Sequence, residues 1–140
     1  MIHRCSSFGL ELIKGLDDVE TDTIKIALYD GSASFSSATT VYTASNEISP
    51  SGYTAGGLAL TLVSTYPKLE NGQGAVRFEN PTWTLSSSAT IKWALMYNET
   101  SDNRAILAID LGDARTVIGP YVLNFPLTLA PIIQIAHQVT

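Results

Sequence analysis

The residues most able to do chemistry are few and lie far apart in this 140-residue chain. The two histidines, His3 and His137, stand near opposite ends, and Cys5 is the single cysteine. Chain termini often lie close together, so the two imidazoles can meet in space, but no Cys or carboxylate pattern beside them completes a set of zinc ligands. A single cysteine forms no disulfide within its own chain. We therefore predict no metal site at the histidines and a thiol without a chemical role.

The densest group of carboxylates is a second candidate for chemistry. Asp17, Asp18, Glu20 and Asp22 could collect Ca²⁺. A calcium loop of the EF-hand kind, however, needs oxygens at fixed positions with a glycine between them. We predict a solvated acidic turn here.

The common enzyme signatures are absent together. The chain contains no His-Glu-x-x-His, no Gly-x-Ser-x-Gly, no Gly-x-x-x-x-Gly-Lys and no Cys-x-x-Cys. Its glycine-rich stretches, 52–57 and 72–74, do not follow a strand and open a helix, as phosphate binding requires, so we predict turns. We expect no catalytic residues, no cofactor and no enzymatic activity.

Three further patterns permit more than one interpretation. Asn98-Glu99-Thr100 matches the N-glycosylation sequence, which has meaning only in a secreted protein. Arg104 and Asp110 can each pair with a charge on another strand or on another subunit. The aromatic residues could line a carbohydrate groove, but their alternation within strands favours core packing. They are Trp83, Trp93, Tyr97, Tyr121 and Phe125.

Composition excludes several classes of partner. The formal net charge is −5 and the eight Lys and Arg residues are scattered, which argues against a nucleic-acid surface. No apolar run approaches the length of about 20 residues that spans a membrane, and residues 1–15 lack the features of a signal peptide, so we expect synthesis in a cytosol. Charged residues make up only 15% of the chain, and a large uncharged surface suits subunit contacts.

The element expected to organise the fold is residues 90–111, two apolar strands joined by a polar turn. Alternation places Ile91, Trp93, Leu95 and Tyr97 opposite Lys92, Ala94 and Met96. In the second strand it places Ala105, Leu107, Ile109 and Leu111 opposite Ile106, Ala108 and Asp110. Neither strand has a clean polar face, so both sides must be covered, by other sheets of the domain or by a neighbouring subunit. We expect Trp93 and Leu107 in the subunit core and a neighbour over the face with Lys92, Met96 or Ile106.

The remaining chain reads as short strands separated by turns. We expect a short helix closed by Gly15, a strand at 23–30, an exposed loop at 32–40 held by Phe35, and a bend at 46–57 where Gly56 and Gly57 take positive φ. Further strands are expected at 58–63, 75–79, 82–85, 116–118, 121–125 and 132–136, with an Asn71-Gly72 hairpin tip and a break at Gly119-Pro120. This pattern predicts an all-β fold, an antiparallel β-sandwich of the jelly-roll or immunoglobulin-like kind, with at most one short N-terminal helix. We expect a single domain over 1–140, with extended arms at 1–7 and 127–140.

Three segments together resemble a group of small all-β structural proteins of tailed bacteriophages. They are 21–29 (TDTIKIALY), 52–57 (GYTAGG), and Trp83 followed by 94–98 (ALMYN) and 103–105 (NRA). The resemblance implies a virion component of the capsid cement or head-decoration type. It implies no catalytic residues. The arms particular to this chain are where virion proteins often clasp their neighbours.

The expected function follows from this resemblance. The protein would bind the major capsid protein lattice, stabilise the head and form a symmetric oligomer, with a trimer favoured. It would be made in the host cytoplasm and sit on the capsid surface, without binding nucleic acid or membrane. The expected subunit or partner contacts are Phe8, Phe35, Tyr53, Lys92, Met96 and Ile106. The alternative is a tail or fibre component that binds host-surface glycan, and a small hydrolase is the least favoured competitor.

Overall fold

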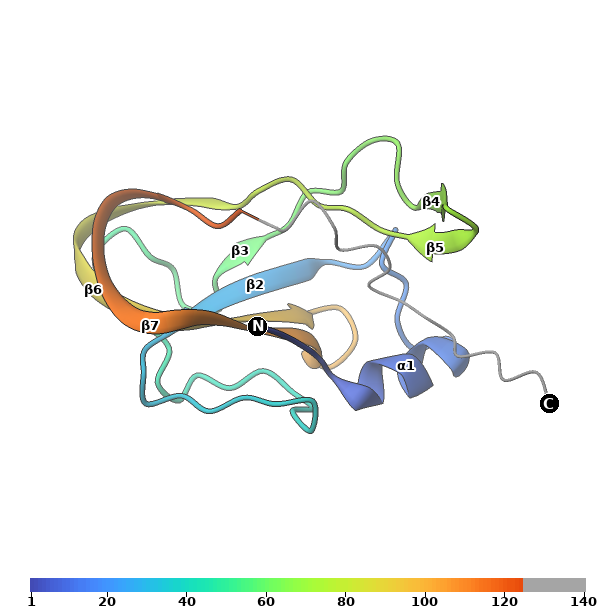
Figure 1. The fold of residues 1–140 in the computed structure, drawn as a ribbon, viewed down its shortest axis with the longest axis horizontal. Coiled ribbons are helices and arrows are strands. Elements are labelled where there is room, and N and C mark those ends of the chain that lie inside the picture. The colour runs from blue at the N-terminus through green and yellow to red at the C-terminus, as the bar shows by residue number, and fades with distance from the viewer. Residues whose placement is uncertain (125–140) are drawn as a thin grey trace.

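The structure is a computed structural model, and it describes residues 1–124 (Figure 1). The predicted all-β antiparallel fold with one short N-terminal helix is confirmed. Its elements are β1 (Ile2–Arg4), α1 (Ser6–Ile13), β2 (Ile24–Tyr29), β3 (Leu58–Ala59), β4 (Lys68–Glu70), β5 (Gln73–Ala75), β6 (Thr82–Asn98) and β7 (Arg104–Val122). No helix among the described residues is both long and apolar enough to cross a membrane.

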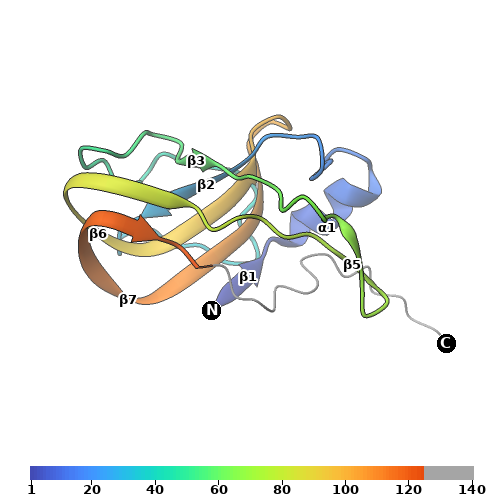
Figure 2. The same cartoon turned by 90° about the horizontal axis from the view of Figure 1, so that it is seen from above.

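One long hairpin, β6–β7, builds most of the fold. Its strands are the centre of a five-stranded antiparallel sheet with the order β1-β7-β6-β2-β3, and β4 and β5 form a separate two-stranded sheet. Figures 1 and 2 show that the hairpin curls, so that its far half folds back over the half that pairs with β2. Register shifts between Leu85 and Ala89 and between Ile91 and Trp93 accompany this bend. Bulges of this kind increase twist and bend a strand, and here they let one hairpin supply both layers of the sandwich.

The long strands replace several short ones that the sequence suggested. Residues 82–85 belong to β6, and 116–118 and 121–122 belong to β7. The predicted break at Gly119-Pro120 is wrong, since Pro120 pairs with Thr84 inside the ladder. Proline is tolerated there because β1 pairs with β7 only at residues 107–109, which leaves the second edge of β7 without a strand partner at Pro120.

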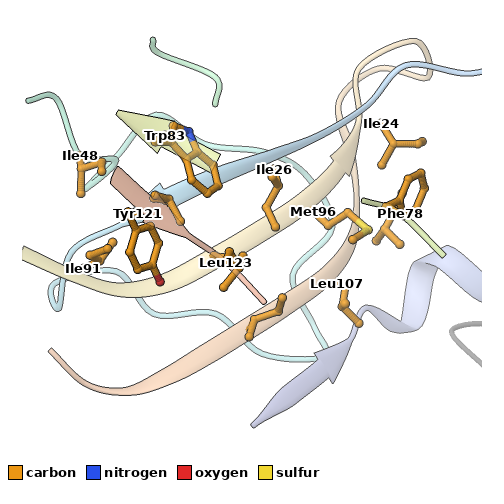
Figure 3. Close-up of a cluster of buried hydrophobic side chains, with 14 of the residues drawn as sticks. Ile24, Ile26, Ile48, Phe78, Trp83, Ile91, Met96, Leu107, Tyr121 and Leu123 are labelled. Carbon is orange, nitrogen blue, oxygen red and sulfur yellow. The ribbon is translucent and has the colours of Figure 1, made fainter. Parts of the chain in front are cut away.

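Two hydrophobic clusters lie on opposite faces of the central sheet. The larger cluster fills the space between the layers (Figure 3) and includes Ile26, Met96 and Leu107 from the central sheet with Trp83 and Tyr121 from the folded-over half. The smaller cluster is covered by the loop between β2 and β3. Its members are Cys5, Ala27, Tyr29, Ala33, Phe35, Trp93, Leu95, Tyr97, Ala105 and Ala108. Both faces of the hairpin are therefore covered by the chain itself, and its two-sided apolarity carries no information about assembly.

The expected alternation along the hairpin fails at two places. Ile106 has no partner between the pairs Met96↔Leu107 and Tyr97↔Ala105, so Ile106 and Leu107 both enter the larger cluster while Ala105 lies in the smaller one. At the other irregularity, Ile91 lies in the larger cluster and Trp93 in the smaller one, although alternation placed them on one face. A bulge resets the period of two, and apolarity alone does not reveal its position.

The turn predictions agree better with the structure. Asn71 and Gly72 both have positive φ at the tip of the β4–β5 hairpin, as do Gly56 and Gly57 in the bend before β3. Gly15, at φ 69°, follows the end of α1. The strand expected at 58–63 is shortened to β3, with an isolated bridge from Leu62 to Phe78.

The structure tests only one of the two predicted arms. Residues 1–7 are not a free arm, because β1 pairs with β7 and α1 begins at Ser6. The predicted arm at 127–140 and the predicted strand at 132–136 lie outside the described residues, together with Phe125 and His137.

Candidate interaction surface

Four of the six expected partner contacts are interior residues. Phe8, Met96 and Ile106 are at most 1% exposed in the larger cluster, and Phe35 is 9% exposed in the smaller one. Phe35 fixes its loop as expected, with its ring edge-on to Tyr29 at 4.7 Å between centroids. These four side chains complete the core of the chain that carries them, so in this conformation they offer no surface to a partner.

Lys92 is half-buried, and its charge is compensated within the chain. Its Nζ donates to Asp110 Oδ1 at 3.0 Å and to the Gly112 carbonyl at 2.7 Å. The hydrogen bond from Lys92 holds the pKa of Asp110 below its ordinary value. The partner of Asp110 thus lies on the neighbouring strand of the same chain.

Tyr53 is the remaining expected contact, and it belongs to an internal network around the Glu47 carboxylate. That carboxylate accepts hydrogen bonds from Tyr42 Oη at 2.6 Å, from Tyr53 Oη at 2.6 Å and from the Gly56 amide at 2.7 Å. Tyr53 Oη also accepts a bond from the Leu28 amide at 3.0 Å. Burial first, and then the Glu47 bond, raise the pKa of Tyr53 well above its ordinary value. The network ties the segment before β3 to β2.

An exposed apolar face belongs to α1. This helix buries Phe8 and Glu11, while Leu10 is 54% exposed and Ile13 is 71% exposed. Residues three positions apart share a helix face, so Leu10 and Ile13 form one outward apolar stripe. Leu16, 41% exposed, follows just after the helix.

A groove of about 370 Å³ lies beside the β4–β5 hairpin and is mainly apolar. Its lining residues are Val19, Pro67, Lys68, Leu69, Gly74, Ala75 and Val76. Leu69 is 77% exposed. Figures 1 and 2 place α1 and this hairpin at the same end of the molecule. We call this region, comprising Leu10, Ile13, Leu16, Leu69 and the groove, the apolar end.

The apolar end was not predicted from the sequence, although the sequence indicated exposed apolar residues in α1. Residues 8–16 carry Phe8, Leu10, Leu12, Ile13 and Leu16 at mixed spacing. A helix of eight residues has one face against the core, so this many apolar positions cannot all be buried. The excess had to face outward.

A second groove, of about 440 Å³, is polar. It lies where β6 departs from its register with β7, and its lining residues are Asp30, Glu47, Ile48, Ser49, Pro50, Ser87, Ser88, Ala89 and Thr90. Its polar side chains include serine and threonine hydroxyls and the Asp30 carboxylate, which suit a hydroxyl-rich ligand, whereas the Glu47 carboxylate is already held by internal hydrogen bonds.

The acidic turn is partly buried, since Asp17 is only 7% exposed, which corrects the prediction of a solvated turn at this residue. Asn98 is 0% exposed, and its amide donates to Asp17 Oδ1 at 2.8 Å and to Asp22 Oδ2 at 2.7 Å. The glycosylation pattern at Asn98 is therefore inaccessible in the folded chain. The sequence did not determine which charge pairs with Arg104. In the structure its Nη1 lies 3.8 Å from Glu11 Oε1 and its Nη2 lies 3.5 Å from Asp102 Oδ2.

The described residues contain no group of three or more His, Cys, Asp or Glu side chains arranged to hold a metal ion. His3 lies against Trp93, with 6.0 Å between ring centroids. Burial, and then the charge of Glu11, raise the pKa of the Cys5 thiol to about 11. A thiol of that pKa stays protonated near neutral pH and is a poor nucleophile.

Core packing of the aromatic residues is confirmed for Trp83, Trp93, Tyr97 and Tyr121, which are all at most 8% exposed. These rings form no carbohydrate groove. No protein family, no curated protein and no solved structure matches this chain.

Proposed function

We propose that this protein is a structural component of a tailed-phage virion, of the cement or decoration type, which binds the major capsid protein lattice and stabilises the head. The observation that carries the proposal is the apolar end. Exposed aliphatic side chains next to an apolar groove are typical of surfaces that bind another protein.

Binding to a lattice requires only a modest contact from each copy. Burying an exposed Leu or Ile side chain contributes about 1.5–3 kcal/mol. Leu10 and Ile13 together would therefore contribute about 3 kcal/mol or more, which is about a hundredfold in affinity. Repetition on a lattice, or within a trimer, multiplies such contacts through avidity.

The segments that carry the phage resemblance lie together in the fold. Residues 21–29 contain β2, which pairs with residues 93–98 of β6. The 52–57 bend meets both, because Tyr97 Oη donates to the Gly56 carbonyl at 2.7 Å and Gly57 lies against the Ile26 carbonyl. The resemblance thus concerns the framework of the sandwich. The apolar end lies outside these segments, as expected if related frameworks carry different binding surfaces.

The test is a paired substitution with a matched control. Leu10→Ser combined with Ile13→Ser removes the α1 stripe, and Ile118→Ser changes an equally exposed aliphatic residue, 64% accessible, on the curled part of β7. We expect co-sedimentation with purified capsids for the parent protein and for the control, and at least about a hundredfold weaker binding for the paired variant. Native mass measurement should show an oligomer, with a trimer expected. A monomer that does not bind capsids would refute the proposal.

A second candidate function is a tail or fibre component that binds host-surface glycan. The polar groove favours it, since hydroxyls and carboxylates such as those of Ser88 and Asp30 recognise sugar hydroxyls. A glycan array would show saturable binding that Asp30→Asn abolishes. Absence of glycan binding together with capsid binding would exclude this candidate.

A further inference from the structure

Two carboxylates are buried beside each other where α1 meets the sheet. Glu11 of α1 and Asp17 of the following turn are each 7% exposed. Asp17 Oδ1 is occupied by the Asn98 amide, whereas Asp17 Oδ2 and Glu11 Oε2 are buried without a hydrogen-bond donor. Buried oxygens without a partner are rare, because their desolvation costs free energy that no new hydrogen bond offsets. These two oxygens therefore need a donor from within their own cluster.

The surrounding charges do not neutralise both groups. Arg104 Nη1 lies 3.8 Å from Glu11 Oε1, but the same guanidinium also lies 3.5 Å from Asp102. Asp22 adds a further carboxylate on the other side of Asn98. The remaining neighbours are the neutral Cys5 thiol and the Ser7 hydroxyl. The Ser7 hydroxyl is also buried without a partner, and its single proton can serve only one of the two oxygens. The one guanidinium near Glu11 is shared with Asp102, and an uncompensated buried charge is strongly unfavourable.

We propose that Glu11 and Asp17 share one proton in the folded protein, and that loss of this proton loosens α1, so that the pair acts as a pH-sensitive latch on the apolar end. In the closed state the Glu11 carboxylic acid donates a hydrogen bond to the Asp17 carboxylate, which satisfies both unpartnered oxygens. In the open state the proton has passed to solvent and two like charges face each other. The helix that carries Leu10 and Ile13 is the element that can move.

The direction of the effect follows from the pKa of Glu11, which is raised above its ordinary value of 4.5 by burial, by the hydrogen bond to Asp17 and by the Asp17 charge. The folded protein thus holds a proton that the unfolded chain releases near pH 4.5. The stabilising effect is fully present below that pH and is lost as pH rises through the raised pKa of the folded state. The attachment of α1 should therefore be tighter in mildly acidic solution than in alkaline solution.

The experiment combines carboxyl ¹³C NMR titration with amide hydrogen exchange, using the full chain without any partner. We expect the Glu11 carboxyl signal to titrate above its ordinary range. Protection factors of the α1 amides should fall as pH rises from mildly acidic to alkaline solution. Glu11→Gln, which stays neutral and keeps an N–H donor, should remove this pH dependence. Glu20→Gln, at an exposed position of the same turn, should keep it.

Titration of the Glu11 carboxyl group within its ordinary range would overturn the inference. Equal pH dependence of the α1 protection factors in the parent protein and in Glu11→Gln would overturn it as well. If Glu11→Gln fails to fold, the titration of the parent protein alone decides the outcome. None of these readouts involves a capsid or a glycan, so their failure would leave the proposed function untouched.

Discussion

Replacing Gly57 by alanine tests how tightly the bend before β3 is held against the sheet. Gly57 has φ 79°, and a Cβ at this position would overlap the Ile26 carbonyl oxygen and lie 2.8 Å from Ala27 Cα. Both atoms belong to the backbone of β2, which pairs with β6 and cannot easily retreat. Gly72 has nearly the same φ, 77°, but a Cβ added there would have no heavy atom within 4 Å. Comparing the two glycines therefore separates backbone strain from steric contact.

The expected magnitudes differ accordingly. The left-handed conformation alone costs an alanine roughly 1 kcal/mol, which is the full effect expected for Gly72→Ala. Gly57→Ala adds an overlap that forces the backbone apart, a further cost of about 1–3 kcal/mol, so we expect about 2–4 kcal/mol in total. Urea unfolding followed by tryptophan fluorescence measures both values, and the urea dependence of the free energy should stay unchanged. Equal destabilisation by the two substitutions would refute the packing described for this bend.

Three further predictions concern single side chains. Glu47→Ala should lower the free energy of unfolding by about 2–4 kcal/mol in the same assay, because three donors lose their acceptor, whereas Glu79→Ala at an exposed site should change it by less than about 0.5 kcal/mol. The Cys5 thiol should not react with a thiol reagent in the folded protein and should react fully in urea; rapid labelling of the folded protein would contradict its burial. Asp110→Asn should reduce the loss of stability on acidification. The pKa of Asp110 is lowered in the folded protein, so its carboxylate stabilises the fold at pH values above its ordinary pKa of 3.8. This contribution is lost as pH falls through the folded-state pKa. Identical acid unfolding curves would contradict this.

Local chemistry explains why parts of the fold could be predicted from the sequence. Asn71-Gly72 fits a turn that needs two residues with positive φ, and the alternation in residues 23–30 has no competing interpretation. The same holds for Phe35, a lone aromatic residue in a loop of small side chains. For the Asn71-Gly72 turn, the decisive backbone conformation lies within the pattern itself.

Features that depend on distant partners could not be predicted in this way. The bulge at Ile106 arises from the pairing of β6 with β7, and the place of Pro120 within a strand depends on where β1 ends. Apolarity indicated that Met96 and Phe8 are covered but not what covers them, so interior residues were mistaken for contacts. The burial of a charged residue, Glu11, on the inner face of α1 reverses the usual helix pattern and likewise follows only from tertiary packing.

The proposed function requires that the apolar end be buried against another protein in a virion. The most direct measurement is a reconstruction, at side-chain resolution, of phage particles that carry this chain. We expect density for the sandwich on the capsid surface, with Leu10, Ile13 and Leu69 covered by the major capsid protein or by a second copy. A position on the tail, or a capsid position that leaves these three side chains in solvent, would contradict it.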